Sequence, residues 1–137
     1  MMKIVGYYVP VLFCAFLLSS CGKGGCNVIP DVTFNVSFSQ AEHPSVLATN
    51  GYAYVSGGVR GLIVYNTGNG LVAYDRCSTV DPGKRNQVKV DEDKYSVIDE
   101  ASGAKWFLMD GSPTHIAECS LRRYSVQKSG VIYYVSN

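Results

Sequence analysis

Short runs of alternating apolar and polar residues constrain this chain most strongly, because neighbouring side chains in a β-strand point to opposite faces. The segment VTFNVSF, residues 32–38, has an apolar residue at every second position. No amphipathic helical stretch follows residue 21. Further short strands are predicted at 52–57, 61–66, 71–75, 87–90, 94–99, 105–109, 122–127 and 131–136. The pattern predicts an all-β domain of small antiparallel sheets, built as a sandwich or barrel.

Turn residues separate these segments. The stretches NTGNG at 66–70, DED at 91–93 and KSG at 128–130 are expected to close three hairpins. The stretch HPSVLATN at 43–50 has no clear period, so we expect a loop or a single helical turn there. Because Trp106 and Phe107 are neighbours in one predicted strand, one should face the core while the other is partly exposed.

The first twenty residues are typical of a secretory signal. Lys3 provides a positive start, and the apolar run from Tyr7 to Leu18 is too short to span a bilayer. The sequence LSSC at 18–21 resembles the lipobox of bacterial lipoproteins. This resemblance implies cleavage before Cys21, acylation of that cysteine and a lipid-anchored position in the cell envelope. An ordinary signal peptide with a cysteine nearby is the alternative.

We therefore expect a signal peptide at 1–20, an acylated cysteine with a flexible tether at 21–27, and one β domain at 28–137. Without Lys3, the eleven remaining basic residues balance the eleven acidic residues. A chain without excess positive charge has no basic patch for nucleic acid, so that class of partner is not expected.

Two segments near the end of the sequence are GAKWFLMDGSP at 103–113 and LRRYSV at 121–126. They resemble a Gly-Ser-x-Phe-x-Leu-x-Asp-Gly segment and the following Pro-Leu-x-x-Tyr-x-Val strand of the Rieske iron–sulfur domain family. Upstream, GLIVYNTGNGLVAYDR at 61–76 resembles the hairpin that leads into the family's first cluster loop. The resemblance implies a Rieske-like fold of stacked sheets over 28–137, with two cluster loops and a covering segment.

The resemblance does not extend to the cluster ligands. A Rieske cluster needs two cysteine thiolates on one iron and two histidine imidazoles on the other. The resemblance places Ser78 and Val80 at the first cysteine and histidine positions, and Asp99 and Ser102 at the second pair. Because none of these residues is a ligand of the family's type, we expect no 2Fe–2S cluster and no other metal.

Three cysteines remain after the signal and Cys21, in a compartment that permits disulfides. The resemblance implies that the first loop, which holds Cys77, packs against the covering segment, which holds Cys119. We therefore expect a Cys77–Cys119 disulfide, with Cys26 as the unpaired thiol. The alternative is that Cys77 and Cys119 are both reduced and buried as small apolar side chains.

Three other motifs invite a functional interpretation, and each has a simpler structural one. His115 lies four residues before Cys119. A catalytic cysteine–histidine pair needs the imidazole within hydrogen-bond reach of the sulfur, and a loop histidine facing water is the simpler expectation. The acidic residues at 91–93 could bind calcium, but a solvated hairpin turn is the expected explanation. The stretch GGVRG at 57–61 lacks the Lys-Ser/Thr of a phosphate loop and is interpreted as a turn.

These observations favour a non-enzymatic, membrane-tethered module with a structural or interaction role. Its expected partners are membrane lipid, through Cys21, and an envelope protein. Two alternatives remain: an electron-transfer protein with an atypical cluster or metal, and a small-ligand binder at the vacated cluster position. A fold does not by itself determine which of these is correct.

Overall fold

The computed structural model describes residues 26–137 of the chain. Ten strands and two short 3-10 helices follow one another in this part. They are β1 (Asn35–Ser39), η1 (Pro44–Leu47), β2 (Tyr52–Val55), β3 (Leu62–Asn66), β4 (Leu71–Asp75), η2 (Pro82–Lys84), β5 (Lys89–Val90), β6 (Ser96–Ile98), β7 (Lys105–Phe107), β8 (Pro113–His115), β9 (Arg123–Ser129) and β10 (Ile132–Ser136). All of their pairings are antiparallel, which confirms the predicted all-β class.

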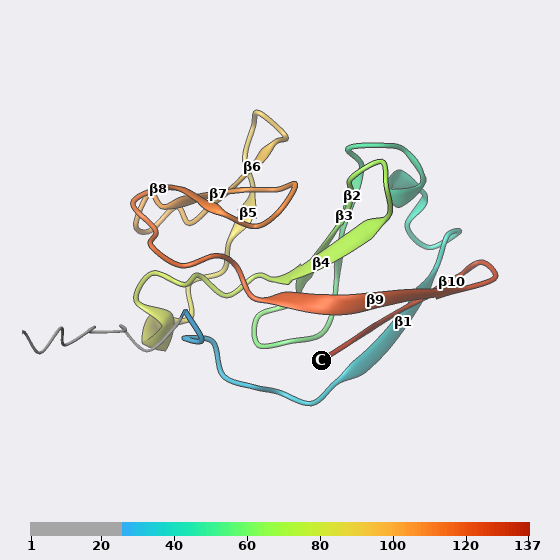
Figure 1. Ribbon diagram of the computed structural model, residues 1–137, viewed down its shortest axis with the longest axis horizontal. Helices are drawn as coiled ribbons and strands as arrows, with labels where there is room; N and C mark the ends of the chain where they lie inside the picture. The colour runs from blue at the N-terminus through green and yellow to red at the C-terminus, as the bar shows by residue number, and fades with distance from the viewer. Residues whose placement is uncertain (1–25) are drawn as a thin grey trace, which may run out of the picture.

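Six strands form the larger sheet, in the order β1-β10-β9-β4-β3-β2 (Figure 1). The first and last strands of the described chain are neighbours, with Phe38 opposite Tyr133. A short pairing of β4 with β9, at Ala73–Tyr124 and Tyr74–Arg123, joins the two halves of this sheet. The last two strands of the sequence therefore lie between β1 and the central hairpin β3–β4.

The smaller sheet has the order β5-β6-β7-β8. Its strands β6 and β7 flank the second loop. The covering segment lies between β8 and β9 and leads back to the larger sheet (Figure 1). The sequence did not predict β8, because Pro113 and its polar neighbours show no apolar alternation. Proline is tolerated at this position because it begins a strand at the edge of a sheet.

The larger sheet curls around one hydrophobic core. Leu62, Val64 and Ala73 of the central hairpin pack in one buried cluster with Phe38 of β1 and Val135 of β10. Strands from both edges of the sheet therefore contribute to the same interior. This curling explains why apolar residues alternate in the terminal strands, which bury a single face.

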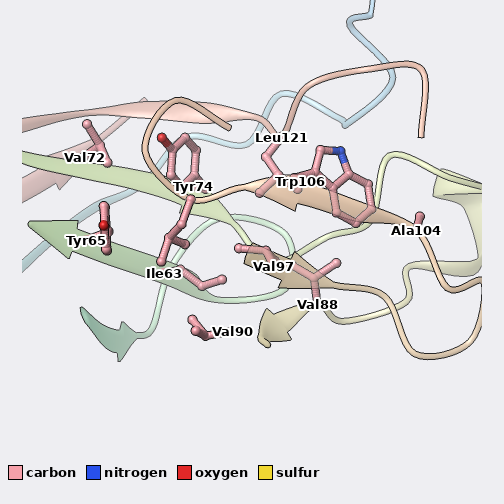
Figure 2. Close-up of a cluster of buried hydrophobic side chains, with 11 residues drawn as sticks. Ile63, Tyr65, Val72, Tyr74, Val88, Val90, Val97, Ala104, Trp106 and Leu121 are labelled. Atoms are coloured by element: carbon pink, nitrogen blue, oxygen red, sulfur yellow. The ribbon is translucent and has the colours of Figure 1, made fainter. Parts of the chain in front are cut away.

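A second core lies between the central hairpin and the smaller sheet. Ile63 and Tyr74 of the hairpin gather with Val97 and Trp106 of the smaller sheet (Figure 2). The strands β3 and β4 are consequently buried on both faces, which accounts for their nearly continuous apolar sequence. Trp106 is fully buried and Phe107 is 39% exposed, which confirms their predicted opposite orientations.

Candidate functional site

The first loop follows β4 and is closed at its base. Cys77 forms an isolated antiparallel bridge with Gln87, and the backbone N–H of Ser78 donates to the carbonyl of Asn86 at 2.8 Å. The helix η2 lies within this loop, and Asp81 and Arg85 at its two ends both have left-handed backbone conformations. These contacts within the loop's own backbone hold the loop in a defined shape.

The second loop joins β6 to β7 and is closed in the same way. The backbone N–H of Asp99 donates to the carbonyl of Ala104 at 2.9 Å, and that of Gly103 donates to the carbonyl of Asp99 at 2.7 Å. The side chain of Asp99 is 1% exposed. A buried carboxylate is costly unless hydrogen-bond donors surround it, so its partners determine the chemistry of this region.

Donors from both loops converge on the carboxylate of Asp99. Asn86 of the first loop donates to Oδ2 at 3.3 Å, and the hydroxyl of Ser102 donates to the same oxygen at 2.8 Å. The backbone N–H of Ala101 donates to Oδ1 at 3.0 Å. Burial raises the pKa of Asp99, but hydrogen bonds from Ser78, Ser102, Asn86 and Ala101 outweigh burial and lower it overall. The carboxylate is therefore a hydrogen-bonded crosslink between the two loops.

The four positions marked by the resemblance to Rieske proteins thus have two different roles. Ser78, Asp99 and Ser102 belong to the hydrogen-bond network, whereas Val80 packs against the core beneath the smaller sheet. This set contains no thiolate and no imidazole, and the valine has no donor atom at all. These residues do not fit the ligand requirement of a Rieske 2Fe–2S cluster.

The predicted Cys77–Cys119 disulfide is wrong. Cys119 is bonded to Cys26, with a Cα–Cα distance of 5.1 Å, and Cys77 is the free cysteine of the described chain. The carbonyl of Cys119 also accepts hydrogen bonds from Thr79 Oγ1 and Trp106 Nε1, each at 2.8 Å. The covering segment therefore contacts the first loop, as the resemblance implies, but its covalent bond is to the N-terminal segment, which the resemblance did not indicate.

The alternative, in which Cys77 and Cys119 are both reduced and buried, is correct for Cys77 only. The thiol of Cys77 is poorly suited to nucleophilic chemistry. The side chain is fully buried, and its burial, followed by the nearby charge of Asp75, raises the pKa of the thiol. A thiol held protonated in an apolar environment is inert. Cys77 accordingly contributes packing volume rather than reactivity.

Asp75 is a second buried hub that the sequence analysis missed. Its carboxylate accepts hydrogen bonds from the backbone N–H groups of Val59 at 2.6 Å, Arg60 at 3.1 Å and Cys77 at 2.9 Å. The hydroxyl of Tyr124 donates to it at 2.7 Å. The turn at 57–61 is therefore held by a side chain from the end of β4, which is consistent with its interpretation as a turn. An aspartate at the last position of a strand that is buried on both faces was the available signal.

The remaining sequence candidates have structural partners. His115 is exposed on β8, and because Cys119 is in a disulfide, the two do not form a catalytic pair. Asp93 accepts hydrogen bonds from Tyr95 and Ser96, as expected for a turn. Between residues 26 and 137, no group of three or more His, Cys, Asp and Glu side chains lies close enough together to hold a metal ion.

A shallow hollow lies where the first loop meets the covering segment. Its volume is about 320 Å³, and it is lined by Val28, Thr79, Val80, Ile116, Glu118 and Cys119. Ile116 also approaches the second loop, since its Cδ1 would lie 3.5 Å from a Cβ added at Gly103. The hollow thus brings together the N-terminal segment and the covering segment with the first loop, and the second loop lies nearby.

Among the described residues, no helix has the length and apolar character needed to cross a membrane. The signal peptide at 1–20 and Cys21 lie outside the described residues, so their predicted roles remain predictions.

Comparison with known proteins gives a likeness of fold. No protein-family model matches the sequence, and no curated protein matches it. The chain is similar to the solved structure of a putative NADH-dependent nitrite reductase small subunit from Mycobacterium tuberculosis. The match covers 78% of this chain and 97% of that chain, with 14% sequence identity and a TM-score of 0.47. At this identity and TM-score, the likeness carries no statement about the activity of this chain.

Proposed function

We propose that this chain is a lipoprotein of the bacterial cell envelope, with a Rieske-like domain that has lost its cluster and serves as a structural or interaction module. The observation that carries the proposal is the network around Asp99. Three of the four positions expected to hold cluster ligands make hydrogen bonds in this network, and the fourth is Val80. A buried, fully hydrogen-bonded carboxylate connects two loops that a metal cluster would otherwise join.

The order of the chain supports the Rieske-like assignment. A central hairpin leads into the first loop, a smaller sheet carries the second loop, and a covering segment returns to the final hairpin β9–β10. The disulfide between Cys26 and Cys119 provides a further covalent connection to the covering segment. These features stabilise the loop region by means that require no redox chemistry, so we propose a non-enzymatic role, with membrane lipid and an envelope protein as partners.

Metal analysis of the purified mature protein tests the loss of the cluster. The protein should contain no stoichiometric iron or acid-labile sulfide and should be colourless, because the four positions offer neither thiolate nor imidazole. A cluster-bearing Rieske protein produced in the same cells serves as the control for cluster assembly. Two irons per chain, with the rhombic EPR signal of such clusters, would overturn the proposal in favour of electron transfer.

Membrane fractionation tests the anchor. Cys21→Ala should release the protein from the membrane fraction, because the acyl chains would then be absent. Cys26→Ser is the matched control: it removes a cysteine five residues away and should leave the protein in the membrane fraction. Retention of the Cys21→Ala protein after a high-salt wash would argue against acylation at this residue.

A further inference from the structure

The described chain begins beside the loop region and is firmly attached there. Cys26 is bonded to Cys119, and the guanidinium of Arg122 donates hydrogen bonds to Asn27 and Asp31. Ile29, between these contacts, is 3% exposed. The N-terminal segment therefore cannot swing away from this end of the domain while the fold is intact.

This attachment limits where the proposed lipid anchor can lie. Cys21 lies five positions before Cys26, and an extended chain spans at most about 3.6 Å per residue, so the anchor reaches about 18 Å from Cys26. A domain of this size has a radius of gyration of about 13 Å, which corresponds to a diameter of roughly 34 Å. The β9–β10 turn lies toward the opposite end of the longest axis from the start of the described chain (Figure 1).

The surface near the Cys26–Cys119 disulfide presents an exposed apolar side chain. Ile116 is 55% exposed and has a backbone φ of 63°. β-branched residues rarely adopt this left-handed conformation, and such strain is often found where a side chain is held for binding. Val28 and Val80 line the same hollow and are half-buried.

We propose that this end of the domain rests on the lipid surface, with Val28, Val80 and Ile116 as its contact. The inference rests on the proposed acylation of Cys21 and adds the orientation of the domain to it. The acyl chains hold the hollow within a short distance of the bilayer, where apolar side chains are favoured in the interfacial region. The disulfide and the contacts of Arg122 make this orientation a property of the fold.

Tryptophan quenching tests the orientation. Full-length acylated Ile116→Trp protein is reconstituted into phosphatidylcholine–phosphatidylglycerol vesicles that contain a doxyl-labelled phosphatidylcholine. Val131→Trp is the matched control, because Val131 is 61% exposed at the β9–β10 turn. The parent protein gives the baseline from buried Trp106. Val28→Trp provides a second probe of the same surface in case the first variant fails to fold.

The indole introduced at position 116 or 28 should be quenched at least about threefold more than the one at position 131, because quenching by lipid-borne spin labels requires proximity to the bilayer.

Vesicle flotation distinguishes failure of the proposed acylation from failure of the proposed orientation. Protein that does not float with the vesicles overturns the proposed acylation and this inference together. Protein that floats but shows equal or stronger quenching at position 131 overturns the orientation alone. A blue-shifted but unquenched indole at 116 would also overturn it, because the indole would then be buried against protein rather than lipid.

Discussion

Asp99 is the side chain on which the contact between the two loops depends. Replacement by alanine would leave the hydroxyl of Ser102 and the amide of Asn86 without their common acceptor. Unsatisfied buried donors cost about 1–3 kcal/mol, so Asp99→Ala should lower the free energy of unfolding by about 2–4 kcal/mol. Urea denaturation of the parent and the variant measures this difference.

The neighbouring Glu100 supplies the control. Its side chain is exposed and pairs with Lys89 on the surface, so Glu100→Ala should change the free energy of unfolding by less than about 1 kcal/mol. Equal effects of the two substitutions would contradict a special role for the buried carboxylate.

The same network makes stability depend on pH. The pKa of Asp99 is lowered in the folded protein, so the ionised carboxylate contributes stability that is fully present above its unfolded pKa of about 3.9 and is lost as the pH falls through the folded pKa. Asp99→Asn cannot titrate. Urea denaturation should therefore show that the stability difference between parent and Asp99→Asn is larger at pH 6 than at pH 3. A constant difference would show that ionisation of Asp99 contributes nothing. The lowered pKa of Asp93 is common to both proteins and cancels in this comparison.

Among the loops and strands, the disulfide is the covalent connection between distant parts of the chain. Peptide mapping without reductant should find Cys26 linked to Cys119, which are 93 residues apart. The chain-entropy model gives at most about 4.7 kcal/mol for closing such a loop. Because Arg122 also holds the N-terminal segment, we expect Cys26→Ser to cost about 2 kcal/mol and to lower the melting temperature by roughly 10 °C in oxidising buffer.

Cys77 provides the comparison for this experiment. Because its thiol is free and buried, Cys77→Ala should show the same loss of stability with and without reductant. In contrast, reductant should largely remove the difference between the parent and Cys26→Ser. A linked peptide containing Cys77 and Cys119 would contradict the observed pairing.

The turn after β7 depends on a close approach between glycine and tyrosine. Gly111 has a φ of 76°, and an added Cβ would lie 2.7 Å from Cε1 of Tyr74. Gly130, in the β9–β10 turn, has a φ of 62° and nothing within 4 Å of an added Cβ. Gly130→Ala should therefore cost about 1 kcal/mol from backbone strain alone, whereas Gly111→Ala should cost about 2–4 kcal/mol because the core must also shift. Equal costs in thermal denaturation would argue against the close packing of Tyr74.

At the scale of the whole domain, we expect cooperative unfolding because both hydrophobic cores share the central hairpin. Strands β3 and β4 supply side chains to both hydrophobic cores, so neither core can be lost while the other keeps its full set of contacts. Fluorescence of Trp106, the chain's single tryptophan, reports on the core of the smaller sheet. Its urea transition should coincide with that of far-UV circular dichroism, which follows both sheets. Two separated transitions would show that the cores unfold independently.

Local patterns in the sequence were sufficient to predict the all-β class, the three hairpins and the opposite orientations of Trp106 and Phe107. Alternation and turn residues act over a few neighbouring positions, so they can be detected without knowing the rest of the fold. The continuous apolar sequence of the central hairpin likewise follows from its burial on both faces. The signal peptide and Cys21 are inferred from the sequence and lie outside the described residues.

Long-range contacts determined the remainder. The pairing of Cys119 with Cys26, and the convergence of Asn86 and Ser102 on Asp99, depend on the path of loops that are separated along the chain. Sequence spacing does not show whether Cys119 pairs with Cys26 or with Cys77. A disulfide requires Cα atoms within about 7 Å and converging Cβ vectors, and spacing along the chain determines neither. Only the packed fold satisfies that geometry, which is why Cys77 is a buried free thiol and Cys26 carries the covalent link.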